Sequence, residues 1–137
     1  MHIPPADRFR SERDRNNPRL PVRCFAPVAG TGYDLLVPEG VENEPDAASL
    51  ALAQVVLPAI DAIVDEAVDH VRRYVDAERL GIAAGRPDVH GVFCDAAYER
   101  VEVSFSWEVQ IYLLRTVAFH RDGTGRRTPV ELSVRPR

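Results

Sequence analysis

The chain has 137 residues, of which 45% are hydrophobic and 28% charged, as is typical of one soluble globular domain. No secretory signal is visible and no apolar run approaches the 18 residues of a membrane span, so we expect a cytoplasmic protein without membrane contact. Residues 31–110 hold sixteen acids against five arginines, a net of −11 between two basic ends; this argues against nucleic-acid binding and favours a basic protein partner.

Residues 1–18 are rich in Arg, Asp, Asn and Pro and contain few large apolar side chains. Such a segment buries too little surface to order itself, so we expect a flexible Arg-rich arm. Residues 19–137 then form a single domain. Between Leu20 and Pro38, the alternation around Val22 and Cys24, the turn PVAGTG and the run YDLLV predict a β-hairpin.

Residues 46–80 form the one long segment with helical periodicity. Apolar side chains recur at steps of three and four from Leu50 to Val75, which places them on one face of a helix. Asp46 or Ser49 is the expected N-cap, and Gly81 marks the end.

Pro58 interrupts this helical pattern. Proline inside a helix removes a backbone donor and clashes with the preceding turn, at a cost of about 3 kcal/mol. We therefore expect either a kink at Pro58 or two helices, about 47–56 and 58–79, with Pro58 in the first turn of the second.

The remainder of the sequence predicts β-structure. DVHGVFCDA is a short strand in which Gly91 marks a bulge or a close approach. From Val101 to Leu113 apolar and polar residues alternate without a slip, with Trp107 in the apolar phase. One strand through residue 120 would span roughly 66 Å, so a bend is expected near Trp107–Gln110, and the phase shifts around Leu114.

HRDGTGRRT predicts a last hairpin turn, and Val130, Leu132 and Val134 alternate in a final strand. The predicted order is β-β-α-β-β-β-β. It indicates the α+β class, with a mostly antiparallel sheet of about five to six strands packed on the long helix.

The polar face of the predicted helix carries a column of carboxylates. Asp61, Asp65 and Asp69 follow one another at four-residue spacing, with Arg72 and Asp76 on the same side. This pattern is typical of a solvated helix face, and it also suits docking of a basic partner. Oxygen ligands for a metal normally converge from loops or several elements, so we predict no metal site and no cofactor.

A second group of reactive residues is His90, Cys94 and Asp95. A thiolate paired with an imidazole is the arrangement of a thiol hydrolase. In a regular strand His90 and Cys94 share a face but lie about 13 Å apart, beyond hydrogen-bond reach. The alternative interpretation is a reduced, buried cysteine beside a surface histidine, since no export signal points to disulfides.

The order of elements resembles a group of small bacterial α+β proteins. The shared features are an N-terminal hairpin, a helix ending in a tyrosine (here VDHVRRYV) and strands holding a Trp-Glu pair (here VSFSWEV), over roughly residues 20–135. This group includes domains of unknown function and immunity proteins that neutralise a sibling's toxin. Members often follow Trp-Glu with an acid, His and Gly, where this chain has Val109, Gln110 and Ile111, so we transfer no functional residue.

Three functions follow from these observations. The first is a non-enzymatic protein-binding domain of immunity or adaptor type, which uses the acidic helix face against a basic toxin or another basic protein. The second is a small thiol- or His-dependent hydrolase centred on His90 and Cys94. The third is a structural homo-oligomer that pairs its edge strands.

Overall fold

A computed structural model describes residues 3–12, 19, 22–41, 43–74, 86–108, 113–121 and 126–136. Its seven strands are β1 (Arg10–Glu12), β2 (Arg23–Pro27), β3 (Asp34–Pro38), β4 (Asp88–Asp95), β5 (Arg100–Ser106), β6 (Leu113–Arg121) and β7 (Arg127–Pro136). Its helices are η1 (Ala6–Arg8), α1 (Ala47–Val56), η2 (Leu57–Ala59) and α2 (Ile60–Arg72). The chain is therefore α+β, as predicted.

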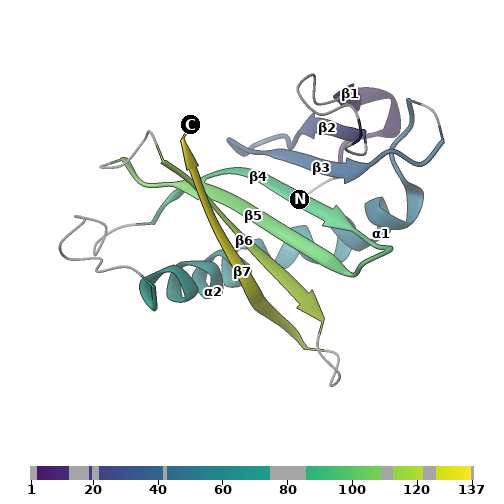
Figure 1. Cartoon of the computed structure of the whole chain (residues 1–137). Helices are drawn as coiled ribbons and strands as arrows, with labels where there is room; N and C mark the ends of the chain where they lie inside the picture. The colour runs from purple at the N-terminus through teal and green to yellow at the C-terminus, as the bar shows by residue number, and fades with distance from the viewer. Residues whose placement is uncertain are drawn as a thin grey trace.

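The seven strands form one sheet in sequence order (Figure 1). Neighbouring strands are antiparallel except β3 and β4, which run parallel. Parallel neighbours need a crossover connection, which α1, η2 and α2 provide on one face of the sheet. Neither α1 nor α2 lies on the other face (Figure 1), which we call the helix-free face.

The predicted strand number and order need a correction, because the observed order is β-β-β-α-β-β-β-β. The additional strand, β1, lies within residues 1–18, where we expected a flexible arm. It pairs with β2 through Ser11 and Cys24, and the buried ring of Phe9 precedes it. All three β1 residues are exposed, so their sequence carries no alternating apolar signal.

The predicted interruption of the helical segment at Pro58 is confirmed, but Pro58 does not lie in the first turn of a second helix, because α2 begins at Ile60. A 3₁₀ turn, η2, contains this proline and separates α1 from α2. Asp46 is the N-cap of α1, where its carboxylate accepts a hydrogen bond from the backbone N–H of Ser49 at 3.1 Å. Helix α2 ends at Arg72 and is followed by a turn at residues 73–74, so it is shorter there than expected; residues 75–79 of the predicted helix lie outside the described residues.

Strands β5 and β6 confirm the predicted bend, because β5 ends at Ser106 and β6 begins at Leu113. The inward phase of β6 continues through Arg115, Val117 and Phe119, all buried. The predicted phase shift around Leu114 is therefore wrong: the apparent shift arises because an arginine occupies an inward position. The actual irregularity of the ladder lies between Ala118 and Phe119.

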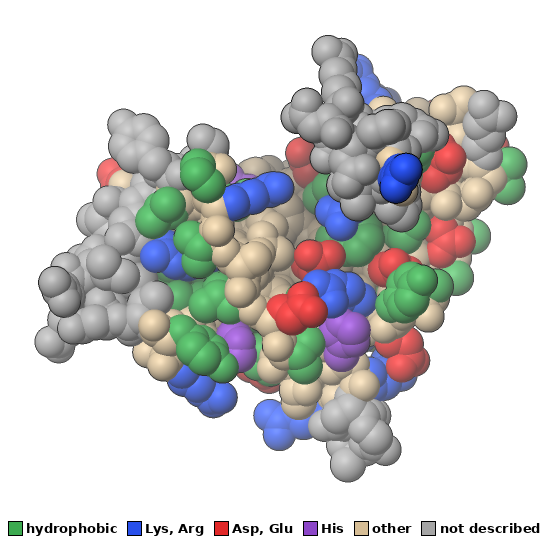
Figure 2. Space-filling model, in the orientation of Figure 1, with side chains coloured by type: hydrophobic (Ala, Val, Ile, Leu, Met, Phe, Trp, Pro, Cys, Tyr) green, Lys and Arg blue, Asp and Glu red, His purple; other side chains and the backbone are tan. Residues whose placement is uncertain are grey.

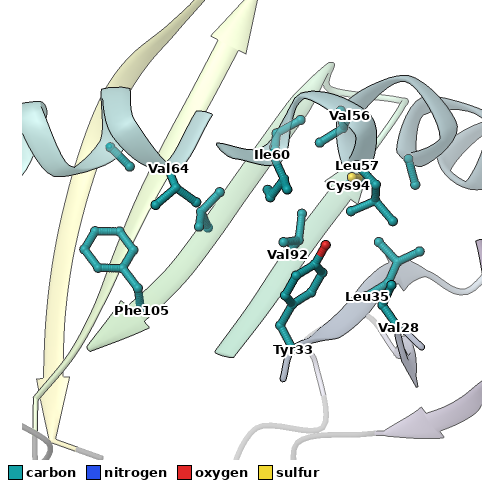
Figure 3. Close-up of a cluster of buried hydrophobic side chains, with 14 of the residues drawn as sticks. Val28, Tyr33, Leu35, Val56, Leu57, Ile60, Val64, Val92, Cys94 and Phe105 are labelled. Carbon is teal, nitrogen blue, oxygen red and sulfur yellow. The ribbon is translucent and has the colours of Figure 1, made fainter. Parts of the chain in front are cut away.

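The core lies between the helices and the sheet. Figure 3 shows Ile60 and Val64 pointing from α2 towards Val92 of β4 and Phe105 of β5. Phe105 is fully buried and Val64 is 2% exposed. Burial of such side chains contributes about 1.5–3 kcal/mol each, so this layer fixes which sides of α1 and α2 face outwards.

Candidate functional site

The outer side of α2 presents the predicted column of carboxylates. Asp61, Asp65 and Asp69 are all exposed, and we call these three residues the acidic face. Arg72 is exposed one turn further along the helix, whereas Asp76 lies outside the described residues. The structure thus brings four of the five predicted residues onto one side of α2.

An arginine that the sequence did not associate with α2 lies on the acidic face. Arg86 Nη2 lies 3.4 Å from Asp61 Oδ1 and 3.7 Å from Asp65 Oδ1. All three side chains are more than half exposed, so these ion pairs contribute at most about 1 kcal/mol. Arg86 is 25 residues from Asp61, and no local spacing rule could predict the contact. The acidic face therefore binds a guanidinium already.

A pocket of about 240 Å³ adjoins the acidic face. Its lining comprises Asp65, Val68, Asp69, Arg72, Arg86 and Pro87. The two carboxylates are balanced by the two arginines of the lining, so a long basic side chain would fit this hollow by taking the place of an arginine, with its aliphatic stem on the two apolar residues.

The outer side of α1 differs from that of α2 because it is apolar. We call Ala48, Ala51 and Val55 the apolar face; all three are exposed, Val55 by 66%. Tyr98, 74% exposed, belongs to the β4–β5 turn that contacts the start of α1. Exposed apolar side chains in a group are typical of interaction surfaces.

The stretch Ala47–Arg72 is also long and apolar enough to cross a membrane by length and composition. Our expectation that no segment approaches that length was wrong here, because charges are sparse until α2. Core helices of soluble proteins pass the same test, and in the described residues this helix packs on the sheet. The cytoplasmic location stays a prediction.

The helix-free face of the sheet carries an ionic network, seen as adjoining acidic and basic side chains in Figure 2. Arg100 of β5 bonds Glu131 of β7 and contacts Glu102 at 3.4 Å. Its Nη1 lies 2.8 Å from His120 Nε2. The hydrogen bond from Arg100 lowers the pKa of Glu131 and, in return, raises that of Arg100. Three strands contribute, so the network was not predictable from one segment.

His90, Cys94 and Asp95 do not converge. A bulge between Val89 and Gly91 shifts the register of β4, so the expectation that His90 and Cys94 share a face was wrong. His90 Nε2 bonds Ser106 Oγ at 2.6 Å. Cys94 is fully buried on the helix side, where burial raises its pKa to about 12.

Asp95, the third member of this group, serves the turn that follows β4. Its carboxylate accepts a hydrogen bond from the backbone N–H of Ala97 at 3.1 Å. Within the described ranges, no three His, Cys, Asp or Glu side chains gather as metal ligands do. This geometry gives a thiolate–imidazole pair no support.

Comparisons with protein-family models, with curated proteins and with solved structures find no match to this chain. The resemblance to immunity-type proteins therefore stays a prediction. Function must be argued from the surfaces of the molecule itself, and the outer sides of α1 and α2 offer the most distinctive ones.

Proposed function

We propose that this protein is a non-enzymatic protein-binding domain of the immunity or adaptor type, whose acidic face docks a basic protein such as a toxin. The observation that carries the proposal is the contact of Arg86 with Asp61 and Asp65. It demonstrates that exposed carboxylates at this spacing hold a guanidinium, which a partner's arginine would supply in trans.

The apolar face extends this surface. From Ala48 through Ala51, Val55, Ala59 and Ala62 to Asp65, exposed positions follow one another at steps of three and four. An apolar strip that continues into a charged one corresponds to the apolar centre and charged rim of many interfaces. The carboxylates would chiefly accelerate association and select a basic partner.

Arg86 is then an internal competitor of the partner. A basic side chain that enters the pocket beside Asp65 and Asp69 displaces Arg86 or shares the carboxylates with it. Replacing Arg86 by Gln removes this competition and one positive charge. Association with the partner should therefore become faster, by a few-fold at low salt.

The test begins with tagged protein as bait in the native host and continues with the purified partner. The combined variant Asp61→Arg, Asp65→Arg, Asp69→Arg should bind that partner at least tenfold more weakly than wild type. The matched control Asp7→Arg, Glu12→Arg, Glu44→Arg changes the net charge equally at exposed positions outside α1 and α2 and should bind nearly as wild type does.

Equal binding by both triple variants would overturn the docking role of the acidic face. Recovery of a partner protein without excess basic charge would also overturn the docking role of the acidic face. For the immunity type specifically, the partner expressed alone should inhibit growth, and co-expression of this chain should restore it; the combined acidic-face variant should fail to restore growth.

A homo-oligomer is the second candidate, and strand β7 favours it. This ten-residue strand is at the edge of the sheet, and its Val130 and Val134 are 51% and 48% exposed. Long apolar edges pair readily with other chains. Light scattering should then show a dimer that Val130→Lys with Val134→Lys dissociates; a monomeric wild type would exclude edge pairing.

A further inference from the structure

The inward position of Arg115 is the least expected feature of the core. Arg115 follows the apolar phase of β6 and is only 2% exposed. It lies opposite Phe105 of β5 and Val134 of β7 in the ladder, on the side of the sheet that α2 covers. Its Nε and Nη1 are buried without a hydrogen-bond partner in the part of the chain that the structure describes.

A buried guanidinium without a counter-ion is strongly unfavourable. Lysine or histidine relieves such a situation by releasing its proton, but arginine stays charged in proteins. Burial lowers the pKa of Arg115 from its ordinary value. Within the described part of the chain, this charge therefore has no hydrogen-bond partner at Nε or Nη1.

Trp107 lies beside this charge and also carries a buried N–H donor without a hydrogen-bond partner among the described residues. The Arg115 guanidinium carbon is 5.4 Å from the centre of the Trp107 ring, which stabilises the cation through the ring face. The indole Nε1 is itself buried without a partner among the described residues, and Trp107 is 3% exposed. Two arginine donors and one indole donor therefore lie near one another, and none of the three has an acceptor among the described residues.

We propose that Arg115 and Trp107 form a binding site for a small organic monocarboxylate. A set of donors without acceptors is complementary to an anion, and a planar guanidinium matches the two oxygens of a carboxylate. The surroundings are apolar: the Phe105 ring packs edge-on against Trp107 with centroids 5.4 Å apart. A doubly charged phosphate would lose far more hydration there than a monoanion with an apolar body.

The chain contains a single tryptophan, so its fluorescence reports on this site alone. Benzoate and butyrate, titrated at constant ionic strength, should change Trp107 emission saturably and raise the melting temperature, with Kd below about 1 mM. The neutral analogues benzamide and butyramide should do neither. Inorganic phosphate, titrated in the same way, tests whether the site binds carboxylates specifically or any anion.

Arg115→Met separates binding from structure. Without added carboxylate this variant should melt at a higher temperature than wild type, because an uncompensated buried charge is replaced by an apolar chain of similar length. Its affinity for benzoate should fall at least tenfold. Trp107→Phe retains an aromatic ring, although a smaller one, and removes the N–H donor, so the thermal shift that benzoate causes should shrink.

Three results would overturn the proposal. They are an absence of any saturable response to benzoate and butyrate, an equal response in Arg115→Met, and a response to phosphate alone. A large drop in the melting temperature of ligand-free Arg115→Met would also contradict it, since Arg115 would then be a structural residue. If that variant does not fold, the comparison of Trp107→Phe with wild type decides.

Discussion

The hydroxyl of Ser49, in the first turn of α1, accepts a 3.0 Å hydrogen bond from the backbone N–H of Ala96, in the turn that joins β4 to β5. The same hydroxyl donates to the Asp46 carboxylate at 2.7 Å. Ser49 is fully buried. One side chain therefore connects the cap of the helix with a turn of the sheet 47 residues away.

Replacing Ser49 by Ala should lower the free energy of unfolding by about 1–3 kcal/mol, because the Ala96 N–H loses its acceptor in a part-buried site. Urea denaturation measures this change. Ser133→Ala, at an exposed position of β7, is the control and should stay within about 0.5 kcal/mol of wild type. Equal effects of the two substitutions would show that the Ser49 bridge adds nothing.

The two cysteines should be unreactive in the folded protein. Cys24 and Cys94 are both fully buried, and a pKa of about 12 leaves Cys94 almost entirely as the thiol at pH 8. A thiol-specific chromogenic disulfide should label neither residue in native protein and both in guanidinium chloride. Rapid native labelling that Cys94→Ser abolishes would instead support the thiol-hydrolase alternative.

Stability should fall on mild acidification because of His70. Burial, followed by the charge of Arg73, lowers the pKa of His70 from its ordinary value of 6.5. Between the lowered value and 6.5 the unfolded chain binds more protons than the folded one, so the free energy of unfolding decreases as the pH falls below 6.5 and is fully regained above it.

The matched variant for this pH effect is His70→Gln, which cannot titrate. Urea denaturation at pH 7 and pH 5 should show a smaller loss of stability for the variant than for wild type. Identical losses would assign the acid sensitivity to carboxylates elsewhere in the chain.

Gly91→Ala should change the free energy of unfolding by less than about 1 kcal/mol. An added Cβ would meet Leu36 Cδ1 at 3.2 Å, a tight contact with the end of a flexible side chain. The cost is offset by an effect of similar size, because alanine loses less backbone entropy than glycine on folding. In a Leu36→Ala background the steric contribution to this change in the free energy of unfolding disappears. A double-mutant cycle in urea should therefore show coupling between Gly91 and Leu36; zero coupling would exclude the contact.

Local patterns in the sequence were sufficient for the helix and most strands. Asp46 as a cap, the break at Pro58 and the alternation from Val101 to Phe105 each depend on neighbours within a few residues. Strand β1 was missed because its three exposed residues acquire a strand conformation only through pairing with β2.

The candidate sites depend on contacts between residues that are distant in the sequence. Arg86 reaches Asp61 only because the chain returns past α2 to begin β4, and the bulge at Gly91 separates His90 from Cys94. Arg115 was hidden for another reason: a pattern search treats any charge as outward-facing, whereas this arginine lies in the apolar phase.

The parallel junction of β3 and β4 divides the sheet in a way that matters for how it forms and opens. Only three residue pairs join these strands, beginning with Asp34 and Gly91, whereas the ladders on the C-terminal side are longer and connect sequence neighbours. Contacts between residues distant in sequence form late in folding. Strands β4–β7 should therefore pair with one another before β3 pairs with β4. In the folded protein, amide hydrogens of the β3–β4 ladder should exchange before those of the C-terminal ladders.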